Sequence, residues 1–572
     1  RMKISMRGTT KVMFAALGLR RSWGLLSPVV GPSFCRRRGG AALLSSSFVA
    51  GEPLSFREAA TSDARVGDYE VSRSQSKDSR TYTKVRELAQ SPTPVWVRGR
   101  VKSIRAKGNL CFLVLREMGD ASTTAQACYF KDKGNADESK AMLKWLGHLT
   151  VESVVDVFGT AVEATVKSCS QKDVELQISK LFVVTRAPAQ LPFLVEDAGR
   201  SERDIEASRD SERPLAGVGQ DARLDSRWLD LRTPATSAIF KIRAAICRSF
   251  RRSLDDRGFL EIHSPKLIAG ESESGAGVFT TDYFGRTACL AQSPQLYKQM
   301  AIAGDLDRVY EIAPVFRAEK SNTKRHLCEF TGLDFEMGIA ENYVETVRLA
   351  YAVFKEIFQD LETKYAKELA LVRDQFPSEP PVIADEPVVL SFAEVVTMLR
   401  EDFEEKSKKE ESTEATTTEE EKGGALCFPE KLEDLTTKQE IQLGALVKER
   451  YGTDFYVVDR YPTSARPFYT MPAADDPLVS NSYDFFLRGQ EICSGAQRVH
   501  DVALLKEQLM AKGIDPSDCS ESLASYLAAF SHGAPPHAGC GFGLDRVLFL
   551  YLNLPNIRGA SLFPRDPSRL AP

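Results

Sequence analysis

The chain has 572 residues, of which 43% are hydrophobic and 27% are charged, and its net charge is −4. This composition is ordinary for a folded protein and excludes a chain that is disordered throughout. The small negative charge excludes nucleic-acid binding through net charge alone, so any basic surface must be local. The longest uninterrupted apolar run, residues 12–19, is too short to span a bilayer, and no membrane partner is expected.

Eleven cysteines without a CxxC pair indicate reduced thiols and argue against a disulfide framework or a zinc site. We therefore expect a cytoplasmic protein. The N-terminal leader raises an organellar alternative, because nine Lys and Arg precede the first acidic residue, Glu52, as in transit peptides. A leader without any targeting role fits equally well. Residues 52–80 stay polar and Ser-rich, so we expect disorder over residues 1–80.

Residues 94–187 predict a small β domain, because glycines separate short segments of alternating polarity. The expected elements are one helix, Glu138–Leu146, and five strands, Val95–Val101, Leu110–Leu115, Ala125–Tyr129, Val151–Val157 and Val174–Val184. This pattern is typical of a closed barrel such as an OB-fold, which we place at residues 90–187. Residues 80–190 hold 17 Lys and Arg against 11 Asp and Glu, which suits single-stranded nucleic acid. Phe112 is either a base-stacking platform or a core residue, and its spacing alone favours the core.

A larger domain is expected at residues 223–572, after a linker at residues 188–222. Apolar residues recur every three or four positions from Ile239 to Phe250, which predicts an amphipathic helix. The strand that follows runs into Pro265, which suits a sheet edge or an interface.

An acidic tract interrupts this larger domain. Residues 401–424 contain ten acidic and four basic residues, and such a run cannot pack a core. We expect a solvated surface loop there, and not a domain boundary.

Residues 308–338 predict a strand, a polar loop and a second strand. Period-two alternation in the second strand puts His326, Phe330 and Asp334 on one face. At the loop, Arg317, Glu319 and Arg325 cluster in sequence. Two arginines and an aromatic ring can clamp a phosphate and sandwich a purine. A salt-bridged surface hairpin is the alternative at this point.

Residues 482–498 predict a hairpin with two carboxylates. A turn centred on Leu487 and Arg488 would place Asp484 opposite Glu491. Such carboxylates are suitable for Mg²⁺ with phosphates, or they pair with nearby arginines instead.

Residues 537–552 predict a Gly-rich strand that leads into an apolar helix, and Gly541 and Gly543 would permit close approach of a ligand. The chain contains no GxGxxG fingerprint here and no P-loop sequence. His532 and His537 are the only histidines with metal-type spacing, and they lie in a Pro/Gly loop, where a ligand pair is the weaker interpretation.

Three separated segments, taken in order, resemble the three motifs of class II aminoacyl-tRNA synthetases. They read GFLEIHSPKLI, FRAEKSNTKRHLCEF and GCGFGLDRV. LPFLVEDAGR, LDSRWLDLRTP and the barrel resemble the subgroup that charges Asp, Asn and Lys. QSPQLYKQ and EICSGAQR are similar to the aspartyl enzymes of eukaryotic and archaeal type. The resemblance covers roughly residues 90–572, with Asp545 standing where the family usually has Glu.

This resemblance implies an α+β protein, with an N-terminal OB-fold barrel that reads an anticodon and a catalytic domain built on an antiparallel sheet flanked by helices. It implies activation of L-aspartate with ATP and transfer of the aspartyl group to tRNA-Asp. It also implies Mg²⁺ and a homodimer whose interface includes Pro265.

The resemblance assigns the nucleotide contacts. Arg317 would bridge the substrate carboxylate and the α-phosphate, while Arg325 and His326 would hold the distal phosphates. Phe330 and Arg546 would sandwich the adenine, with Glu319 near its amine. The catalytic residues would be Arg317, Arg546 and Glu491. The whole expected ATP site is Arg317, Ala318, Glu319, Arg325, His326, Leu327, Phe330, Glu491, Gly543, Leu544, Asp545 and Arg546. Mg²⁺ would be held by Asp484, Glu491 and Ser494.

The resemblance also assigns the other two substrates. The expected aspartate site is Ser272, Glu273, Gln295, Lys298, Arg317, Asp334, Ser494 and Arg498. Lys298 and Arg498 would face the side-chain carboxylate, Arg498 as a bidentate fork. Phe112 would stack on an anticodon base and Gln126 would read one, which reverses the preference for a core Phe112.

Three rival functions remain open. An asparaginyl enzyme shares the fold, but a neutral amide does not suit the two cations Lys298 and Arg498. A non-catalytic RNA-binding paralogue should have lost Arg317, Glu491 or Arg546, and all three are present. An asparagine-forming amidotransfer relative would lack the barrel.

Overall fold

The computed structural model describes residues 52–74, 80–132, 134–270, 277–413 and 433–572. The basic leader that raised the organellar alternative lies outside these residues, and so does the part of the aspartate site at Ser272 and Glu273.

The N-terminal barrel is confirmed. Its five strands are β2 (Val95–Lys107), β3 (Leu110–Arg116), β4 (Thr124–Phe130), β5 (Val154–Glu163) and β6 (Val174–Thr185). β5 pairs with both β2 and β6, which closes the barrel. Apolar side chains on alternate positions fill its interior, and α2 (Ala136–Leu146) packs against them through Met142 and Leu146. The short 3₁₀ turn η1 (Val85–Glu87) precedes β2.

The prediction of disorder to residue 80 is wrong for residues 52–74. They form α1 (Phe56–Thr61), begun by a capping box at Ser55, and β1 (Val66–Asp68), which pairs in parallel with β6. Phe56 stacks on Tyr69 with ring centroids 4.2 Å apart, and Tyr69 stacks on Phe182 of the barrel. Burial of these rings offsets the chain entropy that composition alone takes as decisive.

Four short helices follow the barrel in the chain. These are α3 (Val195–Ala198), α4 (Glu202–Ala207), α5 (Gln220–Asp225) and α6 (Arg227–Asp230).

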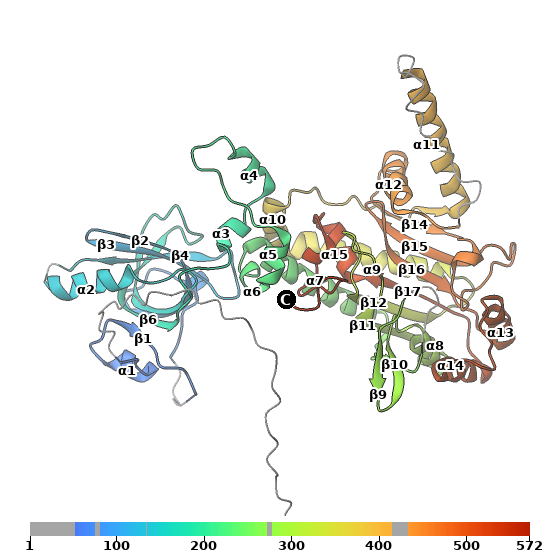
Figure 1. Ribbon diagram of the computed structural model, residues 1–572, viewed down its shortest axis with the longest axis horizontal. Helices are drawn as coiled ribbons and strands as arrows, with labels where there is room; N and C mark the ends of the chain where they lie inside the picture. The colour runs from blue at the N-terminus through green and yellow to red at the C-terminus, as the bar shows by residue number, and fades with distance from the viewer. Residues whose placement is uncertain (1–51, 75–79, 133, 271–276, 414–432) are drawn as a thin grey trace, which may run out of the picture. The chain divides into compact units, whose positions relative to one another are not determined.

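An eight-stranded sheet organises the large domain (Figure 1). In spatial order its strands are β13 (Val389–Ser391), β14 (Phe455–Asp459), β15 (Ser482–Leu487), β16 (Gln490–Gln497), β17 (His537–Gly543), β12 (Glu329–Gly338), β11 (Arg308–Phe316) and β7 (Leu260–Glu261). The six central strands are mutually antiparallel, and both edge strands pair in parallel. The expected antiparallel catalytic fold is confirmed.

Three helices cover one face of this sheet. α7 (Pro234–Asp255), α9 (Val344–Lys364) and α15 (Leu544–Tyr551) pack their apolar side chains against strand residues such as Leu333, Phe335 and Phe542. α7 is the predicted amphipathic helix, capped by the Thr233 hydroxyl with Pro234 in its first turn. α10 (Ala366–Gln375) packs beside α7 and α9. The opposite face of the sheet is thereby left for a site.

Smaller elements surround the open face. β8 (Leu267–Ile268), β10 (Arg286–Leu290) and β9 (Thr280–Tyr283) form a three-stranded sheet, and α8 (Gln295–Ala303), α13 (Val502–Ala511) and α14 (Glu521–Ser531) share an apolar cluster. The described residues of this domain also include the 3₁₀ turns η3 (Thr463–Ala465) and η4 (Ile557–Gly559).

The acidic tract is not wholly a loop. Its first part belongs to α11 (Phe392–Thr413), where Lys406 pairs with Asp402 one turn earlier at 2.7 Å. Residues 414–432 lie outside the described part, and α12 (Thr437–Tyr451) follows. The prediction of a surface loop is therefore wrong for residues 401–413.

Candidate active site

The open face of the large sheet contains a cavity of about 350 Å³. Its lining includes many of the residues predicted from the sequence: Gln295, Arg317, Glu319, Arg325, His326, Leu327, Phe330, Asp334, Glu491, Ser494, Arg498, Gly543, Asp545 and Arg546. Residues that are more than 200 positions apart in the chain thus meet in one cavity.

Strand alternation explains why β12 contributes to both faces. Phe330 and Asp334 line the cavity, while Leu333 and Phe335 enter the core on the other face. The predicted shared face is confirmed for Phe330 and Asp334. His326 lines the same cavity but precedes the strand, in the loop between β11 and β12, so its predicted position on the strand is wrong.

Two predicted nucleotide residues lie outside the cavity lining. Leu544 is fully buried in the core. The backbone N–H of Ala318 donates to the Gly277 carbonyl at 2.8 Å. Asp545 is buried, accepts the Thr331 N–H at 2.9 Å and lies 3.4 Å from Arg243, so its carboxylate is held by the protein.

Glycine at position 541 allows Asp334 to sit at the base of the cavity. Gly541 of β17 lies opposite Asp334 of β12, and a Cβ at 541 would come within 2.6 Å of the Asp334 carboxylate. The close approach predicted for this Gly-rich strand is therefore made by a neighbouring side chain of the protein.

Three arginines and one histidine line the nucleotide end. The Arg317 guanidinium lies 5.6 Å from the Phe330 ring centroid, and Arg546 donates to the Glu491 carbonyl at 3.0 Å. Arg325 pairs with Glu440 of α12. Burial, with the Arg546 charge, lowers the pKa of His326, which favours a neutral imidazole.

The hairpin β15–β16 differs from the prediction. Its turn is at Arg488 and Gly489, both with positive φ, and a bulge follows Phe485. Asp484 therefore lies opposite Ser494, while Glu491 lies opposite Phe486.

Arg466 occupies the acidic part of the cavity. It contacts both Asp484 oxygens at 3.1 and 2.7 Å and donates to the Ser494 hydroxyl at 3.0 Å. Burial, together with the Asp484 charge, raises the pKa of Glu491 to about 7. In the described part of the chain no three His, Cys, Asp or Glu side chains form a metal cluster. The Mg²⁺ set therefore stays a prediction.

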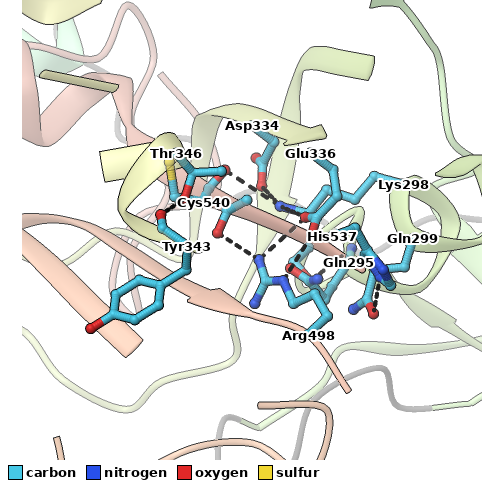
Figure 2. A network of polar contacts seen from close by, with 12 residues as sticks. Gln295, Lys298, Gln299, Asp334, Glu336, Tyr343, Thr346, Arg498, His537 and Cys540 are labelled. Atoms are coloured by element: carbon cyan, nitrogen blue, oxygen red, sulfur yellow. Dashed lines mark hydrogen bonds and ion pairs between the residues drawn. The ribbon is translucent and has the colours of Figure 1, made fainter. Parts of the chain in front are cut away.

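The other end of the cavity rests on a buried ionic network (Figure 2). Lys298 Nζ lies 3.2 Å from Asp334 and 3.3 Å from Glu336. Arg498 binds Glu336 through Nε at 2.8 Å and Nη2 at 3.2 Å, and Nη2 also donates to the Gly539 carbonyl at 2.9 Å. Although burial opposes ionisation, Arg498 and Lys298 hold the pKa of Glu336 below its usual value.

This network changes one prediction. Arg498 was expected to offer a bidentate fork to a ligand, but Glu336 occupies its Nε–Nη2 edge. Within the described residues, Arg498 Nη1 is the guanidinium nitrogen for which no hydrogen bond is found. A ligand carboxylate would therefore meet a single nitrogen of Arg498.

The two histidines with metal-type spacing are engaged locally. His532 contacts the Ala528 carbonyl and His537 contacts the Pro535 carbonyl, each at 2.8 Å. His537 also lies 3.3 Å from Gln299, which accepts a hydrogen bond from Tyr526. Both imidazoles therefore contact oxygen atoms of the protein itself.

Phe112, Gln126 and Pro265 lie outside the cavity lining, and their roles stay predictions. In the barrel, Phe112 of β3 is half-buried and meets the exposed Phe130 edge-on, and Gln126 of β4 donates to Glu175 at 2.9 Å. Pro265 is exposed between β7 and β8.

Sequence reasoning missed Arg466, Glu336 and Glu440. Glu336 had a detectable signal, because it follows Asp334 by two positions on a strand and so shares its face. Arg466 and Glu440 had none, because they come from a loop and a helix outside every recognised segment.

The sequence of this chain matches two protein-family models and is similar to several known proteins. Residues 219–567 match the family model of class II tRNA synthetases (D, K and N), and residues 95–184 match the OB-fold nucleic acid binding domain. The chain is 46% identical to cytoplasmic aspartate–tRNA ligase of Caenorhabditis elegans over 88% of this chain and 90% of that protein. It is 44% identical to the Homo sapiens protein of that name over 89% and 95%.

Solved structures agree with this result. Aspartyl-tRNA synthetase from Entamoeba histolytica superposes with a TM-score of 0.75 at 39% identity, covering 89% of this chain and 97% of that one. Asparaginyl-tRNA synthetase from Pyrococcus horikoshii, complexed with asparaginyl-adenylate, gives 0.66 at 26% identity, covering 86% and 100%. No helix among the described residues is long and apolar enough to cross a membrane.

Proposed function

Because this chain belongs to the class II tRNA synthetases (D, K and N), we propose that it is an aspartate–tRNA ligase. It activates L-aspartate with ATP and transfers the aspartyl group to the 3′ end of tRNA-Asp. The names of its relatives support this choice, and they also support a cytoplasmic location.

The formal charge at the end of the cavity near Lys298 and Arg498, here called the amino-acid end, favours aspartate as the substrate. Lys298, Arg498 and Arg317 supply three positive charges, and Asp334 and Glu336 supply two negative ones, which leaves a formal charge of +1. Zwitterionic aspartate brings a net charge of −1 and neutralises this excess. Asparagine brings zero and leaves a buried positive charge without a partner, which is costly. The same count argues against an asparaginyl enzyme.

The first chemical step brings a carboxylate against a phosphate, and two anions repel. Arg317 and Arg546 both line the cavity, and Arg317 is suited to stabilise the charge on the α-phosphate. Phe330 and Arg546 are suited to hold the adenine from two sides. Positioning and charge stabilisation are then sufficient, without a covalent nucleophile.

Mg²⁺ fits the acidic side of this cavity. Glu491 and Ser494 line this side and, with the neighbouring Asp484, offer hard oxygen donors. Burial, together with the Asp484 charge, raises the pKa of Glu491, and a cation would relieve the effect of that charge. When bound, the ion would neutralise phosphate charge and orient the triphosphate. Arg466 would keep Asp484 in place.

Pyrophosphate exchange measured separately with aspartate and asparagine tests the proposal. We expect exchange with aspartate to exceed exchange with asparagine by about 10⁴-fold, as for sites built around one specific polar partner. Equal exchange with both amino acids, or no ATP-dependent exchange, would reject it. A non-catalytic paralogue would give the second result.

Substitutions in the barrel test the anticodon assignment. We expect Phe112→Ala to weaken aminoacylation of tRNA-Asp by about 1–3 kcal/mol, the cost of one base-stacking contact. Gln126→Ala should act in the same direction. Pyrophosphate exchange without tRNA should stay unchanged in both variants. A parallel loss of exchange would mean that the barrel has only a structural role.

We further propose a homodimer whose interface includes the first motif. Beside Pro265, the apolar side chains of Leu260 and Leu267 are 51% and 47% exposed, which favours a covered surface. Sedimentation of the full chain measures this state directly.

A further inference from the structure

Glu440 is a buried carboxylate that reaches the nucleotide end of the cavity from outside the recognised motifs. It is only 4% exposed. Its two oxygens accept hydrogen bonds from both terminal nitrogens of Arg325, at 2.9 and 3.0 Å. One of them also accepts the backbone N–H of Glu491 at 3.2 Å. A single side chain of α12 thus contacts two residues of the proposed ATP site.

A close backbone contact fixes this position. One turn after Glu440, Gly444 packs against Gly489 at the tip of the β15–β16 hairpin. A Cβ at Gly444 would come within 2.3 Å of the Gly489 Cα, so no other residue fits without displacing the helix. The capping box at Thr436 starts α12 just before Glu440. The helix is therefore anchored where its first turn meets Arg325 and Glu491.

The pairing has a consequence for ATP. Arg325 and Glu440 are largely removed from solvent, with side-chain exposures of 17% and 5%. Both terminal nitrogens of Arg325 face a carboxylate, and its buried Nε has no partner among the described residues. A distal phosphate that takes the two N–H groups now bonded to Glu440 must displace its carboxylate.

We propose that Glu440 is a positioning residue of the ATP site. Its carboxylate holds the Arg325 guanidinium while the site is empty and releases it to the distal phosphates when ATP binds. The inference rests on the proposed function in one respect, the role of Arg325 in binding ATP. Because Glu440 lies at the start of α12, the exchange also links nucleotide binding to the segment that follows residues 414–432.

The direction of the effect follows from competition. In most molecules of the free protein, the group that would bind the ligand is engaged by another side chain. The apparent affinity is then the intrinsic affinity multiplied by the fraction of molecules in which that group is free. Glu440 also adds a negative charge beside a site for a polyanion. Both effects weaken ATP binding, so neutralising Glu440 should strengthen it. A residue that only supported the fold would give the opposite result.

Titration calorimetry of ATP with Mg²⁺ on the full chain tests this. We expect Glu440→Gln to lower the Kd for ATP about three- to tenfold. Gln keeps an acceptor for the Glu491 N–H, so the fold should be retained, which the Tm checks. The matched control is Glu449→Gln, an exposed residue of the same helix, which should leave the Kd unchanged.

Two further measurements make the test specific. In an Arg325→Ala background, Glu440→Gln should tighten ATP binding much less, because the competing pair is absent and only the repulsion by the Glu440 charge is removed. Hydrogen exchange at residues 436–440 should rise when ATP binds the wild-type protein. An unchanged or higher Kd in Glu440→Gln, or equal tightening without Arg325, would overturn the inference. The titration contains no amino acid, so an error in the assignment of aspartate would leave it interpretable.

Discussion

Replacing Arg317 or Arg546 with alanine should reduce aspartyl-adenylate formation by about 10²–10³-fold, the usual effect of removing one charge-stabilising donor. Arg317 follows β11 directly, and Arg546 lies in the first turn of α15. Both line the cavity beside Phe330, and Arg546 is fixed by its hydrogen bond to the Glu491 carbonyl. Water cannot replace either guanidinium as a preorganised partner for the phosphate.

Pyrophosphate exchange with saturating aspartate measures this loss, and circular dichroism with the Tm checks the fold. Arg203→Ala is a suitable control, because Arg203 has a side chain that is 77% exposed on α4, outside the cavity lining. Near-normal exchange in Arg317→Ala or Arg546→Ala would refute the active-site assignment. A lowered Tm with proportional loss of exchange would instead indicate a structural role.

The sequence allowed much of the nucleotide site to be predicted, because regular elements carry it. Because side chains alternate strictly along β12, Phe330 and Asp334 both face the cavity, and the adjacent Gly-rich strand is recognisable from its composition.

Alternation reveals which face of the sheet a side chain occupies, but it does not reveal which side chain it contacts. The bulge after Phe485 moves Asp484 opposite Ser494, and such a bulge leaves no sequence signature here.

The sequence did not reveal those residues that contact the predicted site from irregular segments of the chain. Arg466 lies between a 3₁₀ turn and a loop, where no periodicity constrains its direction, yet it binds Asp484. Its guanidinium also lies 3.9 Å from the ring centroid of Tyr461, which helps to orient it. Long-range packing decides such contacts, and local pattern carries no information about them.

Two predictions that rested on composition were wrong, and for the same reason. Residues 52–74 are polar overall, but Phe56 and Tyr69 find Phe182 on the barrel. Residues 401–413 are highly charged, but oppositely charged residues one turn apart suit a helix. Average polarity measures how much apolar surface is available, whereas order depends on whether a few residues meet the right surface.

The largest change in amino-acid preference is expected for Lys298→Leu. Lys298 is 2% exposed and lies between Asp334 and Glu336. Its loss lowers the formal charge of the amino-acid end from +1 to zero, so aspartate no longer neutralises the site. Removing one partner of a buried ion pair costs about 3–5 kcal/mol, which corresponds to about 10²–10⁴-fold in kcat/KM for aspartate. The Asp/Asn ratio should shrink, while the Kd for ATP should change little.

A second substitution separates net charge from the Lys298 contact itself. Lys298→Leu with Glu336→Gln restores the formal charge to +1, although Glu336→Gln weakens the grip on Arg498. If net charge selects the substrate, the double variant should regain part of the Asp/Asn ratio that Lys298→Leu loses. The measurement is kcat/KM for both amino acids in pyrophosphate exchange, with the Tm of each variant. A wild-type ratio in Lys298→Leu would show that this lysine does not select aspartate. A ratio that stays low in the double variant would mean that the direct contact matters and the charge count does not.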